Sequence, residues 1–192
     1  MSSEIVVVSG LPRSGTSLMM QILGSGGLPL AMDGVRAADE DNPIGYFELE
    51  AVKQLRAGQS GFLTDLCGKA VKIVSLLLRE LPRGFSYRVI FMMRDLSEVL
   101  ASQRAMLARR GVTDDIDDET MSTALRTELV RVADWCASRE DVTLLYVPHD
   151  RLIRDSAREV ARVNAFLGGA LDEVSMSAAV RPELHRRRAP QR

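Results

Sequence analysis

The residues with the clearest chemical potential form a short loop near the N-terminus, Gly10-Leu-Pro-Arg-Ser-Gly15, which continues into Thr16 and Ser17. Two glycines at this spacing are typical of a loop that binds phosphate. In such a loop the backbone N–H groups and the N-terminus of the next helix point at one anion. The sequence therefore predicts an anion site, with Arg13 as a cation inside the loop. The alternative is that the glycines only allow a tight turn between a strand and a helix.

Position 16 argues against the hydrolysis of ATP at this loop. Nucleoside triphosphatases carry a lysine there, because its charge neutralises the β- and γ-phosphates during transfer, whereas this chain has Thr16. Arg94 also precedes Asp95 after the apolar run of residues 89–93, so that run is a poor match to a strand whose acid holds Mg²⁺. A P-loop kinase-like phosphotransferase stays an alternative, with Thr16 as the feature against it.

A second pair of polar residues follows the same apolar run. Arg94 comes at its end and Ser102 eight residues later, within an expected helix. Ligands of α/β sheets bind at the carboxyl ends of the strands, and a guanidinium and a hydroxyl can hold one phosphate from two sides. We therefore expect this pair to bind an anion. The alternative is that Arg94 pairs with Asp95 or Glu98 and that Ser102 only packs within the helix.

Together the two motifs resemble those of sulfotransferases that use 3′-phosphoadenosine-5′-phosphosulfate (PAPS), and the sequence looks closest to small bacterial members of that family. Residues 11–17 resemble the loop that binds the 5′-phosphosulfate, and Arg94 with Ser102 resembles the pair that holds the 3′-phosphate. The resemblance implies that the donor contacts Arg13, Ser14, Gly15, Thr16 and Ser17. It also implies transfer of a sulfuryl group from PAPS to a hydroxyl or amine, on a small-molecule or carbohydrate acceptor, without a metal.

Two further stretches extend the resemblance to roughly residues 4–168. Lys72, between Val71 and Ile73, resembles the family's catalytic lysine, which contacts the bridging oxygen of the donor. Tyr146 ends a stretch that resembles the family's late tyrosine-bearing strand, which implies a contact with the nucleotide. On this basis Arg13 and Lys72 stabilise the negative charge that develops as the donor's bond breaks.

The sequence departs from the family at two places. Val74 stands where sulfotransferases of small phenols and alcohols carry a catalytic histidine, and the late glycine-rich basic motif is missing. Arg181 and the cluster Arg186–Arg188 are candidates to replace that motif, although a solvated basic tail is the simpler interpretation. These departures leave a third alternative, a sulfotransferase-like domain that binds nucleotide without catalysis.

Without that histidine, a carboxylate is the expected base. Glu48 ends the stretch Asn42-Pro-Ile-Gly-Tyr-Phe-Glu48, which resembles a segment common among bacterial members of the family. In an apolar setting a carboxyl's pKa would rise toward the working range of a base. The alternative is that Glu48 only complements the dipole of a helix that begins there. Glu50, Asp33 and Glu40 are the other candidates.

Several elements must position these residues. The apolar runs predict strands over residues 5–8, 69–74, 88–93 and 143–147. Helical patterns follow them over residues 17–24, 47–56, 95–111, 121–136 and 155–167, and residues 24–45 are expected to form a loop. Strands that alternate with helices indicate a parallel sheet covered on both faces. We therefore expect an α/β fold, a three-layer P-loop-like domain with a central parallel sheet.

Length and composition agree with a single domain over residues 1–192. The formal net charge of −1 excludes nucleic-acid binding by bulk charge, and no apolar run is long enough for a membrane span. Two cysteines, Cys67 and Cys136, do not make a disulfide framework or a metal site, so we expect reduced core thiols and a cytoplasmic protein. The acidic run 114–119 is expected to be a surface loop, or else a surface that recognises a cationic acceptor.

Overall fold

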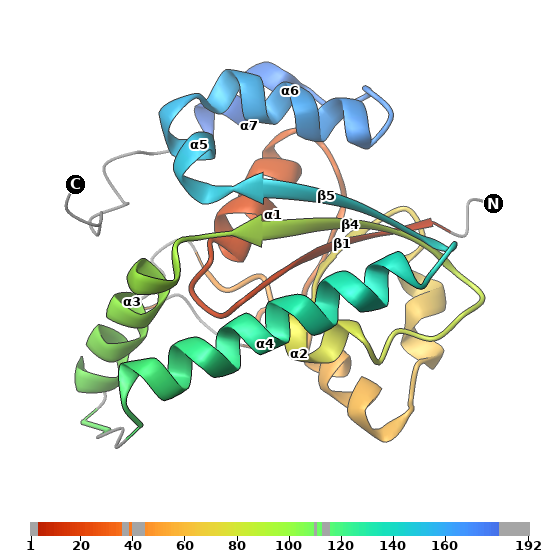
Figure 1. Cartoon of the computed structure of the whole chain (residues 1–192). Coiled ribbons are helices and arrows are strands. Elements are labelled where there is room, and N and C mark those ends of the chain that lie inside the picture. Colours follow the sequence, from red (N-terminus) through yellow and green to blue (C-terminus); the bar gives the residue numbers. More distant parts are fainter. Residues whose placement is uncertain (1–3, 36–38, 40–44, 110, 113–115, 181–192) are drawn as a thin grey trace.

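A parallel sheet forms the centre of the computed structural model, which describes residues 4–35, 39, 45–109, 111–112 and 116–180 (Figure 1). Its strands lie in the order β2-β3-β1-β4-β5, and every pair of neighbours is parallel. The strands are β1 (Glu4–Gly10), β2 (Leu30–Ala31), β3 (Ala70–Lys72), β4 (Ser86–Met93) and β5 (Val142–Pro148).

Helices cover both faces of the sheet and complete three layers (Figure 1). One face packs against α1 (Thr16–Ser25), α5 (His149–Arg154), α6 (Ser156–Phe166) and α7 (Glu173–Ala178). The other face packs against the 3₁₀ helices η1 (Glu50–Ala57) and η2 (Gly61–Leu66), and against α2 (Ser75–Leu78) and α4 (Asp118–Ala137). The helix α3 (Leu96–Arg109) follows β4. The predicted α/β fold with a central parallel sheet is confirmed.

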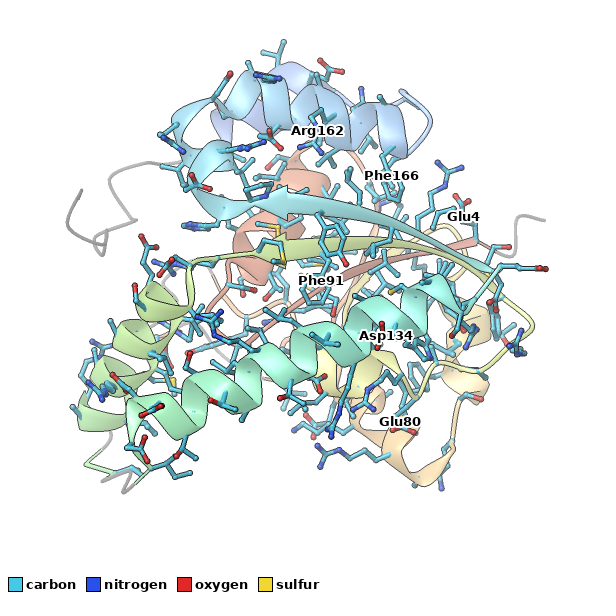
Figure 2. The ribbon with its side chains drawn as sticks, in the orientation of Figure 1. Glu4, Glu80, Phe91, Asp134, Arg162 and Phe166 are labelled. Atoms are coloured by element: carbon cyan, nitrogen blue, oxygen red, sulfur yellow. The ribbon has the colours of Figure 1, made fainter. Side chains whose placement is uncertain are left out.

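The apolar run of β1 explains why this strand is central. Ile5 and Val7 pack into the core on the α2 and α4 side, whereas Val6 and Val8 pack into the core on the α1 side. A strand buried on both faces needs apolar side chains at every position, and β-branched residues suit the pleated backbone. Figure 2 shows the two layers around the sheet: Phe91 lies between β4 and α4, and Arg162 and Phe166 lie on α6.

The strand register brings the predicted site residues to one edge of the sheet. Val8 pairs with Lys72 and Gly10 pairs with Met92. Because all strands are parallel, the loop after β1, the end of β3 and the start of α3 all lie at the carboxyl edge. The sheet therefore positions the loop of residues 10–15, Lys72 and Arg94 near one another, as ligand sites of α/β sheets require.

Three local predictions need correction. The segment 24–45 contains the short strand β2, which pairs with β3, because two residues are enough for an edge strand when a neighbour supplies the hydrogen bonds. The helix expected from residue 47 begins at Glu50 and is a 3₁₀ helix. In the acidic run, Asp117 caps α4 by accepting from the Thr120 N–H, so that part of the run starts a helix.

The helix expected over residues 95–111 is confirmed as α3. The Asp95 carboxylate accepts from the Ser97 N–H at the start of α3, and Gly111 lies in the left-handed region just beyond that helix. Both cysteines are free thiols, and burial raises the pKa of Cys136 to about 11. Within the described part of the chain, no helix is long and apolar enough to cross a membrane.

Candidate active site

The loop between β1 and α1 is built around two glycines that cannot carry a side chain. Gly15, the N-cap of α1, has φ 100°, and a Cβ there would lie 2.6 Å from Cδ2 of His149. A Cβ on Gly10 would collide with the Ser14 hydroxyl and lie 2.9 Å from the Met92 carbonyl oxygen. Thus the glycines do more than allow a turn, because the loop is folded tightly against β4 and α5.

Polar groups at this loop suit an anion. No side chain caps the N-terminus of α1, so its first N–H groups have no side-chain acceptor at the cap position. The Ser14 hydroxyl is buried without a hydrogen-bond partner, in a residue that is only 1% exposed. A buried hydroxyl without a partner is costly in a native structure unless a ligand or water satisfies it. This orphaned group fits a phosphate or sulfate bound at the loop.

Arg13 joins the loop to the second motif. Its backbone is in the left-handed region, with φ 69°, and its Nε donates to the Oγ of Ser102 at 3.0 Å. The Nη1 of Arg94 donates to the backbone carbonyl of Arg13 at 3.0 Å, and the Nε of Arg94 donates to Glu98 at 2.9 Å. Residues about 80 positions apart in the sequence are therefore in direct contact.

The contacts of Arg94 and Ser102 are compatible with both interpretations of the second motif. Arg94 pairs with Glu98, as the structural alternative expected, but it also contacts the loop. Ser102 is 5% exposed, as a packing residue would be, but its hydroxyl accepts from Arg13. The two cations and the hydroxyl thus lie together at the carboxyl edge, where one phosphate could bridge them.

Lys72 lies at the end of β3 and points toward the start of α1. Its residue is 9% exposed. Its ammonium donates to three acceptors: the Tyr46 carbonyl at 2.8 Å, the Ser17 hydroxyl at 3.2 Å and a Glu48 carboxylate oxygen at 3.3 Å. The ammonium is therefore fixed beside the N-terminus of α1. Val74, in the place of the family's histidine, is the N-cap of α2.

The structure brings Glu48 to Lys72 and gives the other candidate bases different surroundings. The Glu48 side chain is 33% exposed and precedes η1. Asp33 instead accepts from the backbone N–H groups of Glu50 and Val35, which hold the pKa of its carboxyl below its usual value. Glu50 is exposed and pairs with Lys53 at 2.6 Å. Glu40, like Arg181 and Arg186–Arg188, lies outside the described residues.

Tyr146 lies elsewhere on the sheet. Its ring packs edge-on against Phe91, with centroids 6.0 Å apart, and Phe91 belongs to the core on the α2 and α4 side. Burial raises the pKa of its phenol, although the residue is still 41% exposed. The predicted contact between Tyr146 and the nucleotide stays a prediction.

Three residues at the site, His149, Asp39 and Tyr46, did not come from sequence reasoning, whereas Glu98 was expected as a partner of Arg94. His149 begins α5 and is 5% exposed, with its ring against Gly15. Glu98 holds Arg94, and Asp39 and Tyr46 contact each other beside Lys72. The position of His149 directly after a predicted strand was a usable signal, because that strand must end at the ligand edge. The contact between Asp39 and Tyr46 has no such signal in the sequence.

Among the residues that the structure describes, no group of three His, Cys, Asp or Glu side chains could hold a metal ion. The cations here are side chains, Arg13, Arg94 and Lys72.

Comparison with solved structures identifies the fold. Over 100% of this chain and 90% of the other, it is similar to the sulfotransferase domain from the Synechococcus PCC 7002 olefin synthase, with 14% sequence identity and a TM-score of 0.60. Retinol dehydratase in complex with androsterone and inactive cofactor PAP has 15% identity and a TM-score of 0.49, over 93% of this chain and 63% of that one. A sugar kinase from Janibacter sp. HTCC2649 has 11% identity and a TM-score of 0.44, over 96% and 98%.

No protein-family model and no curated protein matches this sequence. The similarity to the olefin synthase domain nevertheless shows a sulfotransferase-like α/β fold.

Proposed function

We propose that this chain, as a single domain over residues 1–192, transfers a sulfuryl group from PAPS to a hydroxyl or amine of a small-molecule or carbohydrate acceptor. One observation carries the proposal. The Nε of Arg13 in the phosphate-type loop donates to Ser102 of the second motif at 3.0 Å. The two motifs, whose residue types suit a donor with two phosphate groups, are therefore in direct contact, which supports a single site for that donor. An ATP-binding loop would need a lysine in place of Thr16, and ATP has no 3′-phosphate for the second motif to bind.

The donor would be held at two places. The N–H groups of residues 14–17 and the Ser14 hydroxyl would bind the 5′-phosphosulfate, with the dipole of α1 behind them. Arg94 and Ser102 would bind the 3′-phosphate, and Arg13 lies between the two sites. Because a guanidinium can donate to two oxygens at once, it suits this linking position.

Transfer is an in-line displacement at sulfur. The acceptor oxygen or nitrogen forms a bond to sulfur while the bond from sulfur to the bridging oxygen of the 5′-phosphate breaks, and the electron pair stays on that oxygen. Arg13 and Lys72 stabilise the negative charge there, since fixed cations in a partly buried site need no reorganisation at the moment of reaction. Lys72 suits this role because its ammonium is already held beside Ser17.

Glu48 would accept the proton that the acceptor loses. A carboxylate must lie within hydrogen-bond reach of that proton to act as a general base. Glu48 is 3.3 Å from the Lys72 ammonium, and one third of its side chain is exposed, so an acceptor can approach it from solvent. Asp33 is a weaker candidate, because it already accepts two backbone hydrogen bonds.

Calorimetric titration tests the proposal at the level of donor recognition. We expect 3′-phosphoadenosine-5′-phosphate (PAP) to bind more tightly than ADP, and Arg94→Ala to weaken PAP binding about 10- to 150-fold, as expected for the loss of a charged contact. Arg154→Ala is the matched control, because Arg154 is an exposed arginine of α5 that pairs with Asp150. Equal affinity for PAP and ADP, or tighter binding of ATP with Mg²⁺, would contradict the proposal.

Product formation separates catalysis from binding alone. Incubation with PAPS and a panel of phenols, alcohols, amines and sugars should release PAP and a sulfated product. Tight PAP binding without any product would support the non-catalytic alternative.

A further inference from the structure

We infer that Tyr46 is a positioning residue for Lys72, and that Asp39 in turn positions Tyr46. The inference deepens the proposed function, since it rests on the catalytic role given to Lys72, but its structural part is independent of the nucleotide. Neither residue belongs to the two phosphate-type motifs. Their importance follows from contacts around a single ammonium group.

Tyr46 contacts Lys72 in two ways. Its backbone carbonyl accepts from the Lys72 ammonium at 2.8 Å, the shortest of the three hydrogen bonds described above. The centroid of its ring lies 5.8 Å from the same nitrogen, within the range of a cation–π contact. The carbonyl also accepts from the Ser17 hydroxyl at 3.4 Å. Tyr46 therefore links the end of β3 to the start of α1.

The backbone around Tyr46 has an unusual conformation. Gly45 has φ 95° and Phe47 has φ 51°, so both neighbours lie in the left-handed region. This region is unfavourable for an aromatic residue and persists only when the surroundings enforce it. The ring of Phe47 packs against the core on the α1 side. Strain of this kind at a candidate site indicates that the direction of the Tyr46 carbonyl is imposed by the fold.

Asp39 anchors the other end of Tyr46. The phenol oxygen lies 2.7 Å and 2.8 Å from the two carboxylate oxygens of Asp39, so both oxygens accept from the phenol O–H. Tyr46 is only 5% exposed. A charge-assisted hydrogen bond is stronger than a neutral one and fixes the torsion angles of the tyrosine side chain. Lys72, Tyr46 and Asp39 thus form a chain of contacts that ends outside the phosphate-type loop.

Such an anchor matters because a lysine is flexible. Its side chain has four carbons and loses much rotamer freedom when it is fixed. If the Tyr46 ring and carbonyl shifted, the ammonium could follow Glu48 toward solvent and leave the start of α1. The expected function of the anchor is therefore to keep Lys72 in place while an acceptor binds beside it.

Chemical labelling of lysine tests this inference without nucleotide. The chain has three lysines, Lys53, Lys69 and Lys72, so an amine-acylating reagent followed by peptide mass spectrometry gives one rate for each. Lys53, whose side chain is 69% exposed, is the internal control. In Tyr46→Phe, which keeps the ring but loses the bond to Asp39, we expect Lys72 to be acylated about 3- to 10-fold faster, with Lys53 and Lys69 unchanged.

Asp39→Ala provides a second variant, because Asp39 is exposed and its loss should not unfold the chain. It should raise the Lys72 rate by a similar factor, and the double variant should add little, since both changes break the same hydrogen bond. An unchanged Lys72 rate in both single variants would overturn the inference. So would an equal rise at all three lysines, which would indicate a general loosening of the fold.

A kinetic measurement separates positioning from mere stability. In Tyr46→Phe we expect kcat of sulfuryl transfer to fall by a factor similar to the rise in labelling, with PAP affinity unchanged. A fall in PAP affinity of the same size as the fall in kcat would contradict a specific effect on Lys72. Labelling that changes as expected in a protein that binds no PAP would leave the positioning intact and refute the proposed function instead.

Discussion

Replacement of Lys72 by methionine is expected to remove most of the transfer activity and leave the fold intact. Methionine keeps the volume of the buried stem and deletes only the ammonium. If Lys72 stabilises the leaving oxygen, transfer should fall by at least ~10²-fold, the scale for the loss of one preorganised charge-stabilising group.

The effect on stability follows from the contacts that are lost. The Tyr46 carbonyl loses its 2.8 Å donor but keeps the 3.4 Å bond from Ser17, so the loss should cost about 0.5–1.5 kcal/mol, the net value of an ordinary hydrogen bond. Glu48 is 33% exposed, so water can replace its contact and it adds little. A loss of this size lowers the Tm of a chain of this length by about 1–6 °C. It leaves most of the usual ~5–15 kcal/mol of folding free energy.

Two assays on the same variants separate these effects. Release of PAP from PAPS in the presence of an acceptor measures transfer, and thermal denaturation measures stability. Lys53→Met is the control, because Lys53 is exposed and pairs only with a neighbour on η1 among the contacts described. Transfer at the wild-type rate in Lys72→Met would refute the reasoning. Loss of folded protein in Lys72→Met would mean that the ammonium is structural.

Three further outcomes are expected. Glu48→Gln should abolish transfer while PAP affinity stays nearly unchanged in calorimetry, and a normal rate would exclude Glu48 as the base. Gly15→Ala should destabilise the loop and weaken PAP binding, since a Cβ would lie 2.6 Å from His149. The double variant Gly15→Ala/His149→Ala should regain part of that PAP affinity, and the absence of any gain would contradict this packing. The pKa of Asp33 is lowered in the folded chain, so its carboxylate stabilises the fold above its unfolded pKa of 3.8 and loses this effect as pH falls through the folded value. On acidification below about pH 4, Asp33→Asn should therefore lose less unfolding free energy than the wild type. Denaturant titration at several pH values measures this difference.

Four of the five strands and the residue types of both phosphate-type motifs could be predicted, because local patterns determine them. The buried run of β1 must be apolar at every position, and a glycine is needed where Gly15 takes φ 100° against His149. Arg94 follows the end of a strand, and Ser102 lies two turns further on in the next helix, so their spacing follows from local structure. Such features depend on near neighbours in the sequence, and the fold followed from them.

The surroundings of Lys72 could not be predicted in the same way. Tyr46 and Asp39 reach the lysine through a segment whose path depends on left-handed residues such as Phe47. In the helix expected from residue 47, Glu48 would complement the helix dipole, whereas in the structure it precedes η1 and contacts Lys72. β2 was missed because two residues carry no periodicity, and only pairing with β3 makes them a strand.

The carboxylates of Glu98 and Glu48 determine which anions can compete for the cations of this site. Arg94 already holds Glu98, and Lys72 already holds Glu48. A single small anion such as inorganic sulfate must displace a covalently tethered carboxylate at either place, and tethering gives that carboxylate a high effective concentration. A ligand that carries two anionic groups on one rigid frame gains from both places at once. At Arg94 and Lys72, simple anions should therefore compete weakly, whereas a ligand with two anionic groups should bind more tightly, a selectivity that cations without carboxylate partners would lack.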